Sequence, residues 1–123
     1  MDVKIELVPL DVADVDRSVE FYGTTVGWGV DFDQTPFEGL RFVQVTPPGS
    51  ACSFCFGTGL QMLAEGTKQH LQAVVADADE AHAELTGRGV DCTDVEELAW
   101  GRFVHFDDPD GNKWSLQQLP PRP

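Results

Sequence analysis

Cysteine and histidine are the residues of this 123-residue sequence whose chemistry best suits catalysis or metal binding. Cys52 and Cys55 form a CxxC pattern, which is typical of zinc sites and of redox-active disulfides. The pattern lies within residues 52–56, an apolar run that predicts a β-strand. Residues three apart on a strand point to opposite faces, so we expect these cysteines to share neither a metal nor a disulfide.

Three aspartates, Asp107, Asp108 and Asp110, lie close enough together to suggest a calcium site. They stand within residues 107–112, where proline, glycine and asparagine indicate a tight turn. Aspartates in such turns accept hydrogen bonds from their own backbone. An EF-hand loop would also need a distant bidentate glutamate, which this segment lacks. We therefore interpret the three aspartates as turn residues.

The chain contains an internal repeat, which predicts two similar structural modules. The segment VADVD at residues 12–16 returns as VADAD at residues 75–79. The tripeptide RFV at residues 41–43 returns at residues 102–104, in the same order along the chain. We expect a first module at 1–57, a connector at 58–69, a second module at 70–119 and a tail at 120–123.

Each module predicts one strand, one helix and three further strands, in the order βαβββ. Asp14 and Asp77 are placed as helix N-caps, and apolar residues follow each of them at helical spacing. Paired glycines end each helix. The strands are expected at residues 5–12, 30–32, 40–46 and 51–56, and again at 71–75, 90–95, 102–106 and 113–119.

The charge balance is strongly acidic, with 8 basic and 21 acidic side chains and a formal net charge of −13. Such a surface repels phosphate groups, so binding to nucleic acid or to anionic membranes is not expected, whereas a cationic ligand would be attracted. The charged start of the chain does not resemble an export signal, and the odd number of cysteines suits a reducing compartment. We therefore expect a cytoplasmic protein.

The doubled βαβββ pattern resembles the vicinal oxygen chelate superfamily, which includes glyoxalase I, bleomycin-resistance proteins and extradiol dioxygenases. The resemblance rests on VADVDRS at residues 12–18, FY at 21–22, VGW at 26–28 and the closing DPDGN at 108–112. It implies an α+β fold in which tandem βαβββ modules form a cup-shaped, eight-stranded mixed sheet with helices outside. It also implies a homodimer, and a metal bound on the concave face by residues of the first and fourth strands.

The residues at the four implied metal positions do not suit a metal ion. Alignment with the family places at these positions Leu7, Ser53, His70 and Ser115. Leucine cannot bind a metal and serine hydroxyls are poor ligands, so we expect no metal and no other cofactor. A divalent metal held by His70, His105 and Cys55 stays open as the less favoured alternative.

Alternation along the strands predicts which side chains would line the cup. The set combines aromatic, apolar and neutral hydrogen-bonding groups, which suits a flat or apolar organic ligand. Its members are Leu7, Phe42, Gln44, Ser53, Cys55, His70, Gln72, Phe103, His105, Ser115 and Gln117. Trp28, Phe37 and Trp100 are expected at the rim. Arg41 and Arg102, at equivalent positions of the repeat, are expected to form ion pairs with surface acids.

Two functions follow from this set of residues. The favoured one is a metal-independent small-molecule binding protein, similar to bleomycin-resistance proteins, which holds an aromatic or cationic organic ligand. The alternative is an enzyme with a non-standard site around His70, either a glyoxalase-like lyase or isomerase or a relative of the dioxygenases. In such an enzyme His70 or His105 would act as general base on an acidic C–H group.

Overall fold

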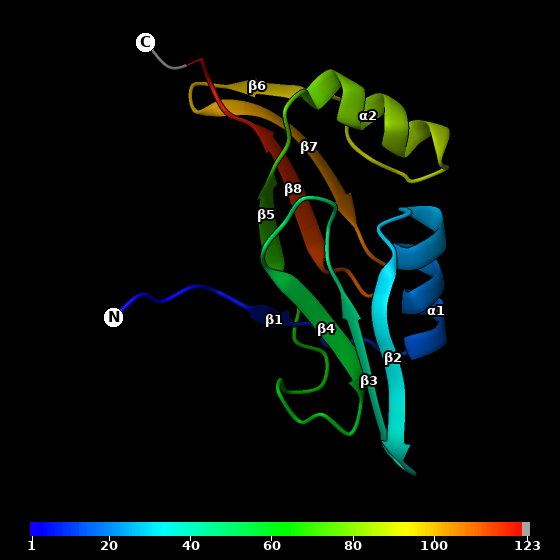
Figure 1. Cartoon of the computed structure of the whole chain (residues 1–123). Helices are drawn as coiled ribbons and strands as arrows, with labels where there is room; N and C mark the ends of the chain where they lie inside the picture. Colours follow the sequence, from blue (N-terminus) through cyan, green and yellow to red (C-terminus); the bar gives the residue numbers. More distant parts are fainter. Residues whose placement is uncertain (122–123) are drawn as a thin grey trace. The chain divides into compact units, whose positions relative to one another are not determined.

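The structure, a computed structural model, describes residues 1–121 and divides the chain into two compact units, Met1–Lys68 and a second starting at Gln69. Each unit combines a four-stranded sheet with helical segments, so the fold is α+β as the sequence predicts (Figure 1). The boundary between the units falls inside residues 58–69, the expected connector. Residues 122–123, the end of the expected tail, lie outside the described residues.

The predicted order βαβββ is found in both units. The first unit contains β1 (Leu7–Pro9), α1 (Val15–Val19), the π-helical η1 (Glu20–Thr25), β2 (Val30–Phe37), β3 (Leu40–Val45) and β4 (Ser53–Thr58). The second contains β5 (His70–Val74), α2 (Ala78–Gly87), β6 (Glu96–Leu98), β7 (Gly101–Asp107) and β8 (Lys113–Gln118).

Both sheets have the same topology, with strand order β1-β4-β3-β2 in the first unit and β5-β8-β7-β6 in the second. The β1–β4 and β5–β8 pairs are parallel, and the other pairs are antiparallel. The first strand of each unit, β1 or β5, is therefore an edge strand that pairs with the last strand of the same unit, β4 or β8. In the second unit this places β8 between β5 and β7, where side chains of three strands can meet on one face.

The helix starts agree with the sequence prediction. The Asp14 carboxylate accepts a hydrogen bond from the Arg17 N–H, and the Asp77 carboxylate accepts from the N–H groups of Asp79 and Glu80. Each cap satisfies amides that have no partner inside the helix. Gly27 follows the first helix with a φ of 80°, a left-handed conformation that favours glycine.

The first helix differs from the prediction in its second half, where the α-helix gives way to the π turn of η1. The Val26 N–H donates to the Phe21 carbonyl oxygen at 2.8 Å, a bond that spans five residues. Glycine and threonine, which are poor helix formers, occupy this turn. The wider turn directs the fully buried Tyr22 edge-on against Phe54, with ring centres 4.7 Å apart. Packing of Tyr22 therefore accompanies the change in helix geometry.

Three strands differ from the predicted ranges by more than two residues at one end or both. β1 is shorter than residues 5–12, and β2 runs beyond residue 32 and through Pro36. Proline is tolerated there because β2 is an edge strand. The prediction of a strand at 90–95 is wrong, because β6 lies at Glu96–Leu98. Within residues 90–95, Cys92 makes an isolated bridge to Phe106. Val90 is buried instead, where its N–H closes the end of α2.

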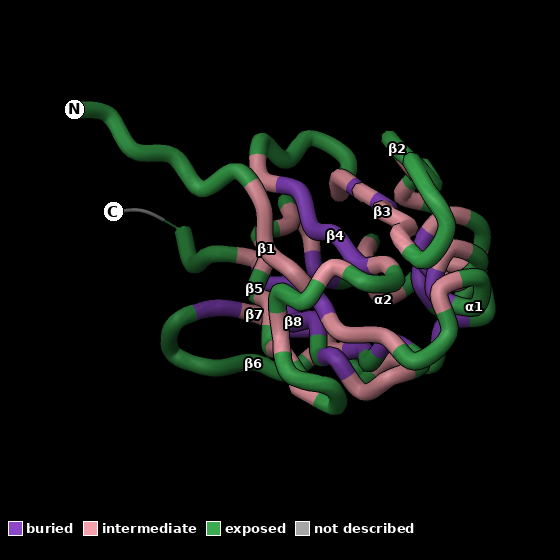
Figure 2. The backbone as a smooth tube through the Cα atoms, turned by 90° about the horizontal axis from the view of Figure 1, so that it is seen from below, coloured by how far each residue is buried: buried purple, intermediate pink, exposed green. Residues whose placement is uncertain are grey.

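Aromatic side chains form the core of each unit on the helix-covered face of the sheet. In the first unit Tyr22 packs against Phe54, Phe56 and Trp28. In the second unit Phe106 and Trp114 stack with ring centres 6.3 Å apart. Most of β4 and β8 is buried, as the purple stretches of Figure 2 show.

Equivalent ion pairs tie the third strand of each unit to its helix. The Arg41 guanidinium donates to Asp33 at 2.9 and 2.8 Å and to Asp16 at 2.7 Å. The Arg102 guanidinium donates to Asp79 at 2.9 and 3.2 Å. Hydrogen bonds from these arginines hold the pKa of Asp33 and that of Asp79 below the usual range. The predicted pairing of both arginines with surface acids is confirmed.

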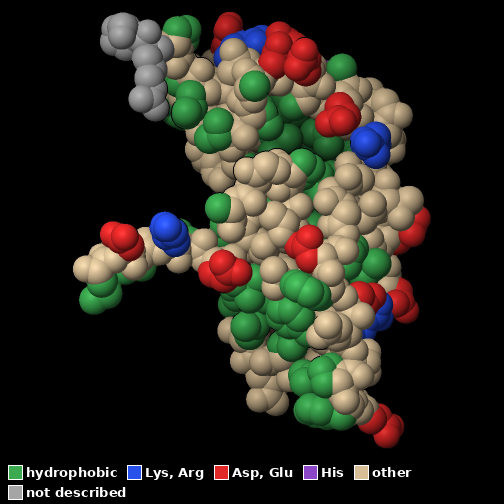
Figure 3. All heavy atoms as spheres, viewed as in Figure 1, with side chains coloured by type: hydrophobic (Ala, Val, Ile, Leu, Met, Phe, Trp, Pro, Cys, Tyr) green, Lys and Arg blue, Asp and Glu red, His purple; other side chains and the backbone are tan. Residues whose placement is uncertain are grey.

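The molecular surface carries many acidic side chains, and on the face drawn in Figure 3 they lie among hydrophobic and polar groups. No helix within residues 1–121 combines the length and the apolar character that crossing a membrane requires.

The closing turn at residues 107–112 is held by Asp108 and Asn112, as expected of turn residues. Asp108 Oδ1 accepts from the N–H groups of Asp110 and Asn112, at 2.9 and 2.8 Å. The Asn112 amide donates to Asp108 Oδ2 at 2.9 Å, and its oxygen accepts from the Gln69 N–H at 2.9 Å. Asn112 is fully buried. The turn thus fixes the start of β5, where His70 stands.

We predict that Asn112→Asp lowers the free energy of unfolding by about 2–4 kcal/mol, because a donor is lost and a second carboxylate is buried beside Asp108. Urea unfolding followed by circular dichroism at pH 7 measures the change. Gln34→Glu, which adds the same charge at an exposed position of β2, is the control and should change stability by less than about 0.5 kcal/mol. Equal effects of the two substitutions would contradict the role given to Asn112.

Candidate functional site

The second sheet has two distinct faces. Arg102 and Gln118 bond to Asp79 and to the Ala78 N–H at the start of α2, so they mark the face that the helix covers. Side chains alternate between the two faces along each strand, so the neighbours of Arg102 in β7 and of Gln118 in β8 point to the other face. We call this other face the histidine face. It consists of His70, Gln72, Phe103, His105, Ser115 and Gln117, all predicted from the sequence.

Ser115 is the centre of the histidine face. Its Oγ lies 2.6 Å from His70 Nε2 and 2.8 Å from His105 Nδ1, both hydrogen-bond distances. The serine is 1% exposed, whereas His70 is exposed and His105 is half-buried. The Phe103 ring stacks on the His105 imidazole, with ring centres 5.8 Å apart. A buried hydroxyl thus positions two imidazoles that have access to solvent.

A second chain of hydrogen bonds continues along the same face. The Gln72 amide donates to Gln117 Oε1 at 2.6 Å, and the Gln117 amide donates to the Trp100 carbonyl oxygen at 2.8 Å. Trp100 itself stands in the turn between β6 and β7 and is 61% exposed. Gln72 and Gln117 are therefore bonded to each other and, through Gln117, to the backbone at Trp100.

A pocket of 290 Å³ adjoins His105 in the second unit. Its lining includes Thr93 and Lys113, which sequence reasoning missed. The Thr93 hydroxyl accepts from the His105 N–H at 2.9 Å, and Lys113 pairs with Asp107 at 2.9 Å. Lys113 precedes Ser115 by two positions and so shares its face, a signal that was present in the sequence. Thr93 could not be placed because the strand at 90–95 was wrongly predicted.

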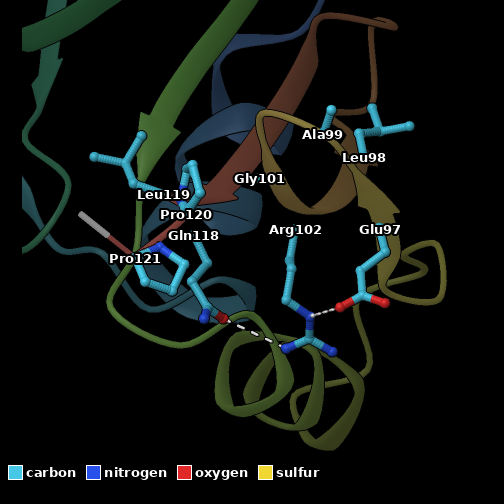
Figure 4. Close-up of a pocket in the computed structure, with 9 residues that line it drawn as sticks. All are labelled: Glu97, Leu98, Ala99, Gly101, Arg102, Gln118, Leu119, Pro120 and Pro121. Carbon is cyan, nitrogen blue, oxygen red and sulfur yellow. Dashed lines mark hydrogen bonds and ion pairs between the residues drawn. The ribbon is translucent and has the colours of Figure 1, made fainter. Parts of the chain in front are cut away.

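A larger pocket of 430 Å³ lies between the β6–β7 hairpin and the end of β8 (Figure 4). Arg102 lines it, and Figure 4 shows its guanidinium held by Glu97 and Gln118. Because Arg102 and Gln118 belong to the helix-covered face, this pocket is separate from the histidine face. The positive charge of Arg102 in this pocket is already paired with the carboxylates of Asp79 and Glu97.

The first unit brings its own predicted residues together on the equivalent face of its sheet. Leu7 is in register with Ser53, and Gln44 is in register with Cys55. Phe42 is paired with Gly57 further along the same face. These side chains are less polar than those of the second unit, and Met62 from the following segment lies 3.8 Å from the Cys55 sulfur.

The two predicted rim residues of the first unit, Trp28 and Phe37, lie in different environments. Trp28 packs against Tyr22 and Phe54, with ring centres 6.1 Å apart in each case, on the helix-covered side of the sheet. Phe37 stands at the end of β2 and is 65% exposed. Trp28 therefore does not join the face that carries Gln44 and Cys55, whereas Phe37 is in register with Leu40, which shares the face of Phe42 and Gln44.

The donor groups at the four implied metal positions do not fit a metal ion. Leu7 and Ser53 in the first unit and Ser115 in the second offer no imidazole, carboxylate or thiolate. His70 Nε2 and His105 Nδ1 are both directed at the Ser115 hydroxyl. Burial raises the pKa of the Cys55 thiol, which disfavours the thiolate that binds metals. Within residues 1–121 no three His, Cys, Asp or Glu side chains gather into a metal site.

We predict that Cys55 reacts with iodoacetamide at least about tenfold more slowly than Cys52 and Cys92 in the native protein, because only the thiolate is nucleophilic. Cys55 is 0% exposed, whereas the other two are half-buried. Peptide mapping by mass spectrometry at pH 7.5 measures the three rates, and the unfolded protein in guanidinium chloride is the control. Equal rates in the native protein would contradict the burial of Cys55.

Comparisons with known proteins agree with this fold. A family model for the Glyoxalase/Bleomycin resistance protein/Dioxygenase superfamily matches residues 4–116. Comparison with curated protein sequences gives no match. The solved structure of TnmS3, an antibiotic binding protein from Streptomyces sp. CB03234, has 31% identity and a TM-score of 0.83, over 97% of this chain and 98% of that one.

Two further structures are similar over nearly their whole length. A glyoxalase/bleomycin resistance protein from Streptomyces sp. CB03234 has 32% identity and a TM-score of 0.78, over 94% of this chain and 100% of that one. A superfamily member from Sphaerobacter thermophilus DSM 20745 has 31% identity and a TM-score of 0.77, over 94% of this chain and 97% of that one. The chain therefore belongs to the Glyoxalase/Bleomycin resistance protein/Dioxygenase superfamily.

Proposed function

We propose that this protein binds a flat aromatic or cationic organic molecule on the histidine face and does so without a metal ion. The observation that carries the proposal is the donor set around Ser115. Two imidazoles share one buried hydroxyl at 2.6 and 2.8 Å, at a position where the family resemblance implies a metal ligand. A hydroxyl in that position cannot replace a carboxylate as a metal ligand, but it can orient imidazoles toward an organic molecule.

The chemistry of the face supports an aromatic ligand with a few polar groups. The His105 ring offers a stacking surface that Phe103 backs from one side. The exposed amide of Gln72 and the imidazoles offer hydrogen bonds that fix a ligand's orientation. The pocket beside His105 gives space for part of such a molecule.

Charge and similarity support the same proposal. The formal charge of −13 raises the local concentration of cationic molecules. TnmS3, which shares 31% identity with this chain, is an antibiotic binding protein. We extend that role to this chain, with an antibiotic-like molecule as the ligand class.

We further propose that two copies of the chain associate and that the protein works in the cytoplasm. Apolar side chains of the second unit are available to a second copy, among them Leu98, Trp100 and Leu119, which are 39%, 61% and 45% exposed. The three free cysteines suit a reducing compartment.

We predict that metal-free bleomycin A2 or doxorubicin, both cationic and aromatic, raises the melting temperature by about 10 °C at a hundredfold excess over Kd. The measurement is a thermal shift assay in buffer that contains EDTA, followed by calorimetry to obtain Kd. His105→Ala should weaken binding about tenfold, which is 1.4 kcal/mol. The reason is that one hydrogen bond and one stacking surface are lost.

His82→Ala is the matched control, because His82 stands on α2 and pairs with Asp94 rather than with the histidine face. It should leave Kd unchanged. Binding that appears only after a divalent metal is added, or that responds equally to His82→Ala and His105→Ala, would overturn the proposal.

An enzymatic role is the second candidate, and the placement of His70 favours it. The imidazole is exposed, and Ser115 holds its Nε2, so its other nitrogen could take a proton from an acidic C–H group. Turnover of the hemithioacetal of methylglyoxal and glutathione in EDTA, abolished by His70→Ala but not by His82→Ala, would establish this role. Binding without turnover would leave the role as a binding protein.

A further inference from the structure

The Ser115 hydroxyl has a single hydrogen, yet it lies within hydrogen-bond distance of two imidazole nitrogens. It can donate that hydrogen to one of them only. The other imidazole must then carry a proton on its facing nitrogen and donate to the serine oxygen. When both histidines are neutral, the protonation of one ring therefore depends on that of the other.

Two arrangements satisfy both hydrogen bonds. In the first, the hydroxyl donates to His70 Nε2 and His105 Nδ1–H donates to the hydroxyl, so both rings are Nδ1–H tautomers. In the second, the hydroxyl donates to His105 Nδ1 and His70 Nε2–H donates to the hydroxyl, so both rings are Nε2–H tautomers. Conversion of one arrangement into the other requires the hydroxyl to rotate and the ring proton of each histidine to move between Nδ1 and Nε2 by exchange with solvent.

The outward-facing nitrogens of the two rings then have opposite roles. Within residues 1–121, His70 Nδ1 and His105 Nε2 form no hydrogen bond, so both are available to a ligand. In the first arrangement His70 Nδ1 donates and His105 Nε2 accepts, and in the second arrangement these roles are exchanged. Either way the pair offers one donor and one acceptor.

We propose that Ser115 is a positioning residue that couples the two histidines, so that the histidine face selects ligands carrying a donor and an acceptor together. A hydroxyl or amine near a carbonyl group is the ligand chemistry that fits, and either orientation of such a ligand is accommodated. This inference rests on the proposed binding function for its ligand, but the coupling itself is a property of the free protein.

The first unit shows why the coupling is confined to Ser115. Ser53, the equivalent serine of the repeat, lies 2.6 Å from the Thr46 hydroxyl. The Thr46 hydroxyl donates to a carboxylate oxygen of Asp31. Because Thr46 has given its hydrogen to Asp31, Ser53 must donate to Thr46, and the direction of this chain is fixed. A carboxylate accepts only, whereas each imidazole on the histidine face can donate or accept.

The experiment measures the tautomers of the three histidines in the free, uniformly ¹⁵N-labelled protein by long-range ¹H–¹⁵N correlation. The spectra are recorded at pH 8.5. We expect the Nε2–H fractions of His70 and His105 to be equal to each other and to change together with temperature. In Ser115→Ala both fractions should move to the value of free histidine, while that of His82 stays unchanged.

Ser115→Thr keeps a hydroxyl and should restore the wild-type fractions of both histidines, which separates loss of the hydroxyl from damage to the sheet. Unequal fractions in the wild-type protein would overturn the proposal without any variant. So would a Ser115→Ala spectrum in which His70 and His105 keep their wild-type tautomers.

Addition of doxorubicin, which carries hydroxyl groups beside carbonyl groups, tests the ligand half of the inference. We expect its binding to shift both histidines toward the same tautomer. A shift of one histidine alone would contradict the coupling. If the free-protein fractions are equal but neither doxorubicin nor bleomycin A2 binds, the coupling stands and the proposed function and ligand class fail.

Discussion

The hydrogen bonding of one buried hydroxyl, that of Ser115, is the constraint on which the candidate site depends. The hydroxyl can act at two imidazoles because β8 is paired on both sides, in parallel with β5 and antiparallel with β7. Register brings His105 directly opposite Ser115, and His70 reaches it from the start of β5. The turn built by Asp108 and Asn112 fixes that start through the Gln69 N–H. Sheet topology, turn and site are therefore parts of one arrangement.

The two units share a scaffold but differ in the chemistry of their faces. Equivalent aspartates cap the helices, and equivalent arginines join the third strands to the first helical turns. On the faces opposite the helices, the first unit places Leu7, Cys55 and a serine tied to a threonine and an aspartate, whereas the second places two histidines and two glutamines. This difference concentrates the capacity for neutral hydrogen bonding in the second unit.

Much of this arrangement could be predicted from the sequence, because period-two alternation and the repeat both constrain which residues share a face. The grouping of His70, His105 and Ser115 followed from alternation together with the positions that the family resemblance implies for His70 and Ser115. Three features could not be predicted for identifiable reasons. The π turn accompanies long-range packing of Tyr22 on Phe54, which no local pattern encodes. The position of β6 depends on pairing with β7, so Thr93 and the pocket beside His105 were missed. Trp28 was expected at the rim, but an aromatic residue next to a helix end suits core packing as well.

The central claim is that the histidine face serves an organic ligand rather than a metal ion. Elemental analysis of the purified, untagged protein tests it most directly, after incubation with Zn²⁺, Ni²⁺, Mn²⁺ or Fe²⁺ and desalting. The account predicts that far less than one equivalent of any metal is retained, and that His70→Ala does not change the amount. Retention of nearly one equivalent per chain that disappears in His70→Ala would contradict the account and assign the protein to the metal-dependent members of its superfamily.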